Sequence, residues 1–295
     1  MRVRVRDTCL FFDVDGAGLV IDGPAMRERP TLVLLSGGPG FDHTVFKPAF
    51  AQLADVAQVI YLDFRGHGRS GRGDPARWTV DDYAKDVRAF CDVLGIGHPV
   101  VLGWSFGGMV AMAYAARHPG HPARLVLQST MARLDIDRVT HGFRRAGGDQ
   151  AAGIARRFWS GSGPQALTAY TQTCGPLYGP SHADPDAAAR AVFNLELLSD
   201  PGSVMRGVDL LPELARVTCP VLVVAGDLDP VCGADAAAEI VAALPPGRVR
   251  FCQFPGAGHH IHRDQPGRFF PLLREFVAGP AAPSDPVPAT PAAPG

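Results

Sequence analysis

The chain has 295 residues, of which 46% are hydrophobic and 19% charged, a balance typical of a globular protein that buries a sizeable core. Its 28 basic and 29 acidic residues give a formal net charge of −1, which argues against nucleic-acid and anionic-membrane partners. No apolar stretch reaches the ~20 residues of a membrane span. The alternating start, Met1-Arg-Val-Arg-Val-Arg6, lacks the apolar segment of a signal peptide. We therefore expect a cytoplasmic protein with no membrane or nucleic-acid partner.

Short apolar runs alternate with helical patterns along most of the chain. The hydrophobic spacing predicts strands at 3–6, 10–14, 31–35, 58–62, 100–104, 124–128, 221–225 and 249–254. It predicts helices at 45–54, 80–94, 106–117, 234–243 and 266–277. The first two strands form an antiparallel pair. Strands that alternate with helices predict parallel β-α-β units in a doubly wound α/β sheet.

The alternation stops at about residue 131 and resumes near residue 211. Residues 131–210 contain no strong strand pattern and are Ala-rich and helical in places. We expect a core of residues 1–130 and 211–278 with 131–210 inserted as a helical cap, or lid. Such a cap belongs over the C-terminal strand edge, where open α/β sheets bind ligands. Residues 279–295 are rich in Pro and Ala with little apolar bulk, which predicts a disordered tail.

Gly103-Trp-Ser-Phe-Gly107 lies where the strand at 100–104 meets the helix at 106–117. A Gly-x-Ser-x-Gly sequence between a strand and a helix is typical of a nucleophile elbow, a sharp turn that lifts the serine above the sheet edge. The flanking glycines remove the Cβ atoms that would clash in such a turn. This context predicts that Ser105 is a catalytic nucleophile rather than part of a small-residue turn.

A serine nucleophile needs a base and a carboxylate, which follow it along the chain in this fold. Gly226-Asp-Leu-Asp229-Pro follows one late strand, and Gly256-Ala-Gly-His259-His260 follows the other. Asp229 is the predicted acid because it lies farther into its loop, and Asp227 is the alternative. His259 is the predicted base because its glycines permit a close approach to the serine, and His260 is the alternative.

Two backbone N–H groups must stabilise the oxyanion of such a reaction. The residue after the nucleophile, Phe106, supplies one of them. The glycine-rich loop that follows the strand at 31–35 supplies the second, from Gly38 or alternatively from Gly37.

No metal or cofactor is expected. His259, His260 and His262 share one short loop, and three histidines so placed rarely converge on a metal without further ligands. The six cysteines show no CxxC spacing, so neither a metal nor a disulfide framework is supported. A serine triad supplies its own nucleophile, base and acid.

Five motifs in this order resemble the α/β-hydrolase superfamily over nearly the whole of residues 1–278. They are Ser36-Gly-Gly-Pro-Gly40, Asp63-x-Arg-Gly-x-Gly-x-Ser70, Gly103-Trp-Ser-Phe-Gly107, Gly226-Asp-Leu-Asp229-Pro and Gly258-His259. The resemblance implies an α/β-hydrolase fold with a helical cap. The second motif is predicted to be structural, with Asp63 and Arg65 bracing a turn.

The Gly-Gly-Pro-Gly loop resembles the proline iminopeptidase group, whose members remove N-terminal residues from peptides. That group usually has His where this chain has Ser36. The resemblance implies acidic cap residues that hold the substrate ammonium, and Glu196 is the candidate here. A solvated helix-face glutamate is the alternative reading. Trp104 is a candidate pocket residue or a packing residue.

The sequence therefore predicts a serine hydrolase that forms an acyl-enzyme and acts on a short peptide or small molecule, most simply as an aminopeptidase. The first alternative is an esterase, lactonase or C–C-bond hydrolase of a small metabolite, because the same triad serves these reactions. The second is a ligand-binding receptor without catalysis. The oligomeric state is left open.

Overall fold

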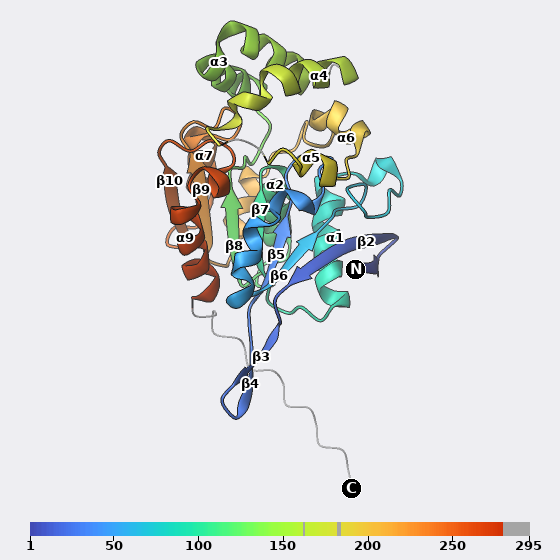
Figure 1. Ribbon diagram of the computed structural model, residues 1–295, viewed down its shortest axis with the longest axis vertical. Coiled ribbons are helices and arrows are strands. Elements are labelled where there is room, and N and C mark those ends of the chain that lie inside the picture. Colours follow the sequence, from blue (N-terminus) through green and yellow to red (C-terminus); the bar gives the residue numbers. More distant parts are fainter. Residues whose placement is uncertain (162, 182–183, 280–295) are drawn as a thin grey trace.

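An eight-stranded sheet forms the centre of the structure, a computed structural model that describes residues 1–161, 163–181 and 184–279 (Figure 1). The strand order is β1-β2-β6-β5-β7-β8-β9-β10. The strands from β6 to β10 run parallel, whereas β2 runs antiparallel to β6 and β1 antiparallel to β2. Their bounds are β1 Arg2–Val5, β2 Thr8–Asp15, β5 Thr31–Leu35, β6 Gln58–Leu62, β7 Val100–Trp104, β8 Arg124–Gln128, β9 Val221–Gly226 and β10 Val249–Phe254. The predicted α/β sheet is confirmed.

Helices cover both faces of this sheet. One face packs against α1 (Val80–Val93), α2 (Phe106–Arg117), α7 (Ala234–Ala243) and the 3₁₀ segment η6 (Leu211–Arg216). The other face packs against α8 (Ile261–Asp264) and α9 (Pro266–Ala278). Every residue of β7, β8 and β9 is buried. Burial on both faces is what makes these strands continuous apolar runs rather than alternating ones.

A helical insertion lies between β8 and β9. It contains α3 (Ile136–Trp159), α4 (Pro164–Thr173), η4 (Gly175–Tyr178), α5 (Ala187–Arg190), α6 (Leu195–Ser199) and η5 (Pro201–Val204). Figure 1 shows α3 and α4 at one end of the molecule. A β-bridge between Arg133 and Asp209 joins the two ends of the insertion. Gly147 and Gly148 have non-helical dihedral angles and kink α3.

Two predictions of local structure need correction. The helix expected at 45–54 is wrong, because the chain forms two 3₁₀ segments there, η1 (His43–Phe46) and η2 (Ala49–Asp55). Pro48 lies between them, and a proline forces the preceding Lys47 into an extended conformation. A second sheet, the hairpin of β3 (Leu19–Asp22) and β4 (Ala25–Glu28), was not predicted from the sequence.

That hairpin projects from the end of the molecule opposite to α3 and α4 (Figure 1). Ile21 of this hairpin is 81% exposed. The hairpin therefore lacks the buried face that produces a recognisable strand pattern in a sequence. The tail predicted to be disordered lies outside the described residues apart from Gly279. Among the described helices, none combines the length and apolarity needed to cross a membrane.

Asp63 and Arg65 hold the loop after β6 in place. The Asp63 carboxylate accepts hydrogen bonds from the backbone N–H groups of His43 and Arg69, at 2.8 Å each. Arg65 is 1% exposed and donates from Nε and Nη2 to the Asp86 carboxylate at 2.5 and 2.7 Å. It also donates from Nη2 to Asp7 at 2.9 Å. These side chains make structural contacts, in agreement with the predicted bracing role.

Arg65→Leu should lower the free energy of unfolding by about 3 kcal/mol, because it leaves the buried Asp86 carboxylate without its principal cation. Urea denaturation followed by circular dichroism measures the change. Arg216→Leu is the matched control, since Arg216 forms an exposed pair with Glu213 and its loss should change stability by about 0.5 kcal/mol or less. Equal stabilities for the two variants would contradict the bracing role of Arg65.

Candidate active site

Ser105 lies at the sharp turn between β7 and α2. Its φ of 56° is rare for a residue with a side chain and identifies a strained turn of the kind expected at a nucleophile elbow. Two contacts from the end of β8 hold the turn. The Ser105 N–H donates to the Gln128 carbonyl at 3.0 Å, and the Thr130 hydroxyl donates to the Ser105 carbonyl at 2.6 Å.

The elbow packs so tightly that glycine is required on both sides of the serine. A Cβ atom on Gly107 would lie 2.1 Å from the Leu35 carbonyl oxygen of β5. A Cβ atom on Gly103 would lie 2.4 Å from the Gly107 carbonyl oxygen. The two glycines therefore let strand, turn and helix approach closely enough to present Ser105.

Asp229 and His259 are joined directly. His259 Nδ1 lies 2.7 Å from Asp229 Oδ2, and both side chains are almost fully buried. The second carboxylate oxygen, Oδ1, accepts hydrogen bonds from the N–H groups of Val231 and Cys232 at 2.8 and 2.9 Å. The carboxylate is thus fixed by the backbone of its own loop, and it orients the imidazole ring.

Trp104 links the loop of His259 to the strand that ends at Ser105. Its indole Nε1 donates to the His259 carbonyl at 3.1 Å, and its ring centroid lies 5.4 Å from the imidazole centroid. Trp104 is 6% exposed, so in this structure it is a packing residue beside the serine. Within the described residues the Ser105 hydroxyl makes no hydrogen bond to His259. Contacts of this kind are often long in ligand-free sites and tighten when substrate binds.

The predicted oxyanion loop lies against the elbow. A Cβ atom on Gly37 would come within 3.0 Å of Ser105 Cβ and 3.1 Å of the Trp104 ring. Gly38 has a φ of 124°, a backbone conformation that favours glycine. Phe106 is the first residue of α2, where a backbone N–H has no acceptor within the helix. Ser36 is fully buried, and its hydroxyl has no partner among the described residues.

The alternative acid and base occupy other positions. Asp227 is exposed and accepts a hydrogen bond from Gly256 N–H at 2.7 Å, which ties its loop to the loop that carries His259. His260 packs its ring against Trp104 at 5.2 Å, and burial holds its pKa well below the usual 6.5. His262 lies 2.9 Å from Gln128, and burial lowers its pKa to about 3.

One cluster of potential metal ligands coincides with the predicted acid and base. The ligand atoms of Asp229, Cys232 and His259 lie within 4.8 Å of one another, and all three residues are buried. However, both Asp229 oxygens are already engaged, one by two N–H groups and the other by His259. Burial also raises the pKa of the Cys232 thiol well above 9.0, so it stays protonated at neutral pH. These residues fit a serine triad better than a metal centre.

Asn194 and Tyr178 of the insertion contact the loops of the site. Asn194 donates from its backbone N–H to the Gly40 carbonyl at 2.9 Å and from Nδ2 to the Gly66 carbonyl at 2.8 Å. Tyr178 accepts a hydrogen bond from the His259 N–H at 2.6 Å. The predicted ammonium anchor, Glu196, follows Asn194 on α6 and is exposed.

Sequence reasoning missed Thr130 and the contact made by Tyr178. Thr130 stands in a polar run, Gln128-Ser-Thr130, at the end of a buried strand, and that local signal could have identified it. Tyr178 is separated from His259 by 81 positions, and no local pattern connects them.

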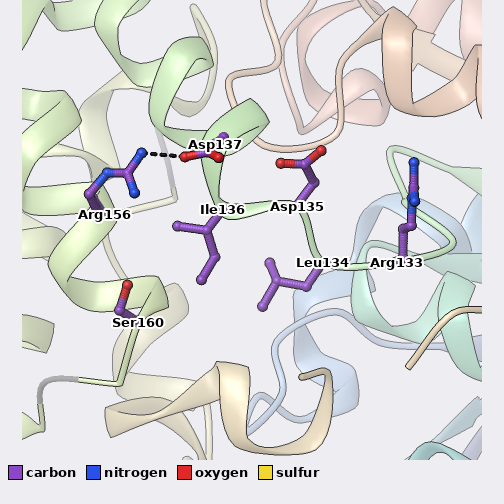
Figure 2. Close-up of a pocket in the computed structure, with 7 residues that line it drawn as sticks. All are labelled: Arg133, Leu134, Asp135, Ile136, Asp137, Arg156 and Ser160. Atoms are coloured by element: carbon purple, nitrogen blue, oxygen red, sulfur yellow. Dashed lines mark hydrogen bonds and ion pairs between the residues drawn. The ribbon is translucent and has the colours of Figure 1, made fainter. Parts of the chain in front are cut away.

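Two surface pockets lie away from these residues. One has a volume of about 400 Å³ and lies between the first and last turns of α3. It is lined by Arg133, Leu134, Asp135, Ile136, Asp137, Arg156 and Ser160. Figure 2 shows its ion pair between Arg156 and Asp137. The other, also about 400 Å³, lies around Trp78 and Arg117. Neither contains Ser105, Asp229 or His259, so neither is assigned to the predicted chemistry.

A family model described as "alpha/beta hydrolase fold" matches residues 30–158. Together with the sheet order and the helical insertion, this match shows that the chain has the α/β-hydrolase fold.

Three known proteins illustrate what the chain resembles. Proline iminopeptidase PfmaB of Pestalotiopsis fici is 26% identical over 85% of this chain and 93% of its own length. The crystal structure of the Mycobacterium smegmatis proline iminopeptidase matches with a TM-score of 0.72 and 23% identity, over 94% of this chain and 97% of its own. The enol-lactonase of Burkholderia xenovorans LB400 matches with a TM-score of 0.67 and 22% identity, over 94% and 99%. At these identities the solved structures establish the fold alone.

The two aspartates of the loop after β9 allow a direct test of the site. Asp229→Asn should lower turnover of any substrate by about 10⁴-fold, because an amide cannot hold the imidazole in the required tautomer. Asp227→Asn is the matched control and should keep turnover near the wild-type value, because this side chain contacts Gly256 rather than a histidine. Kinetic assays on both purified variants decide the matter. Loss of activity in Asp227→Asn but not in Asp229→Asn would assign the acid to the other aspartate.

Proposed function

We propose that this protein is a serine hydrolase whose catalytic triad is Ser105, His259 and Asp229. The observation that carries the proposal is the buried 2.7 Å contact between His259 and Asp229, beside a strained serine at a strand-to-helix turn. A buried carboxylate that orients an imidazole is the arrangement that activates a serine hydroxyl. A receptor without catalysis would not need it.

In the proposed reaction Ser105 attacks a carbonyl carbon while His259 takes up the hydroxyl proton. Asp229 stabilises the imidazolium that forms. The N–H groups of Phe106 and Gly38 donate to the tetrahedral oxyanion, with Gly37 as the alternative to Gly38. His259 then gives its proton to the leaving group, and water hydrolyses the acyl-enzyme by the same steps. No cofactor takes part.

We propose an aminopeptidase of the proline iminopeptidase type, acting on short peptides or amino-acid amides with a free N-terminus. The Gly-Gly-Pro-Gly loop supports this substrate class, and relatives with that name support it at low identity. Glu196 is the proposed partner of the substrate ammonium. Its segment is bonded to the oxyanion loop through Asn194, which brings α6 close to the reaction centre.

A second candidate is an esterase or lactonase, and the exposure of Glu196 favours it. An ammonium group is held tightly when the carboxylate that pairs with it is shielded from water, and Glu196 is not shielded in this structure. An ester or lactone needs no such partner. The resemblance of the fold to both a proline iminopeptidase and an enol-lactonase keeps both candidates in play.

A paired substrate panel distinguishes the two candidates. Wild type and Ser105→Ala are assayed on prolyl and alanyl p-nitroanilides, the N-blocked versions of each, and p-nitrophenyl acetate and butyrate. We expect cleavage of the free-amine anilides that depends on Ser105. Cleavage of the esters alone would establish the second candidate. No Ser105-dependent turnover and no fluorophosphonate labelling would reject the serine hydrolase altogether.

Glu196→Gln should raise the KM for free-amine substrates by about tenfold and leave ester hydrolysis unchanged, because it removes a charge that binds only the ammonium. Glu275→Gln, which alters an exposed pair with Arg250, is the control. An unchanged KM for the anilides would show that Glu196 is a solvated surface residue that does not bind the substrate ammonium.

A further inference from the structure

Tyr178 of the insertion is bound to the loop that carries His259. The His259 N–H donates to the Tyr178 carbonyl at 2.6 Å. The Tyr178 ring lies edge-on to the imidazole, with 5.2 Å between centroids and 80° between planes. A Cβ atom on Gly258 would lie only 2.1 Å from the Tyr178 carbonyl oxygen, so the approach of the two segments depends on glycine there.

A carboxylate joins the same two segments a second time. Asp264 of α8 accepts hydrogen bonds from Gly258 N–H at 2.7 Å and from Ser181 N–H at 3.1 Å. Gly258 precedes His259, and Ser181 follows η4. The residues around Tyr178 and those around His259 are therefore fastened together on both sides of the ring contact.

The hydroxyl group of Tyr178 connects it to the body of the insertion. It lies 2.5 Å from the Tyr170 hydroxyl of α4, which also accepts a hydrogen bond from Trp159 Nε1 of α3 at 3.1 Å. The Phe143 ring of α3 packs edge-on to both tyrosine rings, at 5.6 and 5.9 Å. The position of Tyr178 is thus set by α3 and α4, and a movement of these helices moves Tyr178.

We infer that Tyr178 is a positioning residue for His259, so that seating of α3 and α4 on the core completes the orientation of the catalytic base. The inference rests on the proposed function, because it assumes that His259 is that base. Asp229 holds only the Nδ1 side of the ring. The Tyr178 ring, together with that of Trp104, limits the tilt that remains, and this tilt sets where the other ring nitrogen points relative to Ser105.

The size of the effect follows from how steeply catalysis depends on geometry. A misplacement of about 1 Å in a reacting group costs about 10²-fold in rate. Among the described residues the Ser105 hydroxyl has no hydrogen bond to His259, so the productive alignment depends on the orientation of the ring. A displacement of α3 and α4 would reach His259 through Tyr178, because the two segments are bonded to each other.

The test compares Tyr178→Ala and Tyr178→Phe with wild type. The readouts are the rate constant for fluorophosphonate labelling of Ser105, kcat and KM for p-nitrophenyl acetate, and the thermal unfolding midpoint. Tyr178→Ala should lower labelling and kcat together by about tenfold to a hundredfold, with KM near the wild-type value. Both variants keep the backbone carbonyl, and Tyr178→Phe also keeps the ring, so it should recover most of the labelling rate.

Two further variants separate positioning from stability. Tyr114→Phe removes another buried tyrosine hydroxyl, on α2 and bonded to His121, and should leave labelling unchanged. If Tyr178→Ala does not fold, Tyr178→Leu keeps an apolar side chain without the aromatic edge and should show the same loss of labelling.

Several outcomes would overturn the inference alone. One is labelling of folded Tyr178→Ala, or of Tyr178→Leu in its place, at the wild-type rate. A second is an effect confined to KM, which would make Tyr178 a substrate contact. A third is a labelling loss in Tyr178→Phe as large as that in Tyr178→Ala. Wild-type protein that is not labelled at all would instead reject the proposed function, and the inference would fail with it.

Discussion

The close contact between the elbow and the strands beside it is the constraint on which the site depends. Gly107 lies directly against the Leu35 carbonyl of β5, and Gly103 against the Gly107 carbonyl. Side chains at these positions would push α2 away from the sheet. The serine would then lose its place beside Gly37, whose added Cβ atom would lie only 3.0 Å from Ser105 Cβ. The proposed nucleophile and the predicted oxyanion loop are therefore positioned by the same contact.

The rest of the site follows from the direction of the strands. Because β5, β7, β9 and β10 are parallel, the loops that follow them emerge at one edge of the sheet. These loops carry the glycines, Ser105, Asp229 and His259 in turn. Local hydrogen bonds then fix each side chain, as the N–H groups of Val231 and Cys232 do for Asp229. Strand direction thus brings distant parts of the sequence together, although no single segment contains a pattern that identifies its partners.

The sequence predicts those parts of the molecule whose signal is local. Strands such as β7 are visible because burial on both faces makes them continuously apolar, and Asp229 is visible because of its place in a short loop. The helix at 45–54 was wrong because one residue, Pro48, divides it. The hairpin at 19–28 was missed because neither of its faces packs on the core. The contact between Tyr178 and His259 could not be foreseen, because its partners lie 81 positions apart and meet only after the insertion folds over the sheet.

The point at which the insertion leaves the core explains why it contacts the proposed site. It begins after β8, which lies between the strand that ends at Ser105 and the strand that precedes Asp229. A segment that leaves the sheet at that edge starts beside the loops that carry Ser105 and Asp229. Here it is bonded to the oxyanion loop through Asn194 and to the histidine loop through Tyr178. Under the proposed function, substitutions inside the insertion would act on both sides of the serine and could change which acyl group is accepted while the sheet and the loops that follow its strands stay the same.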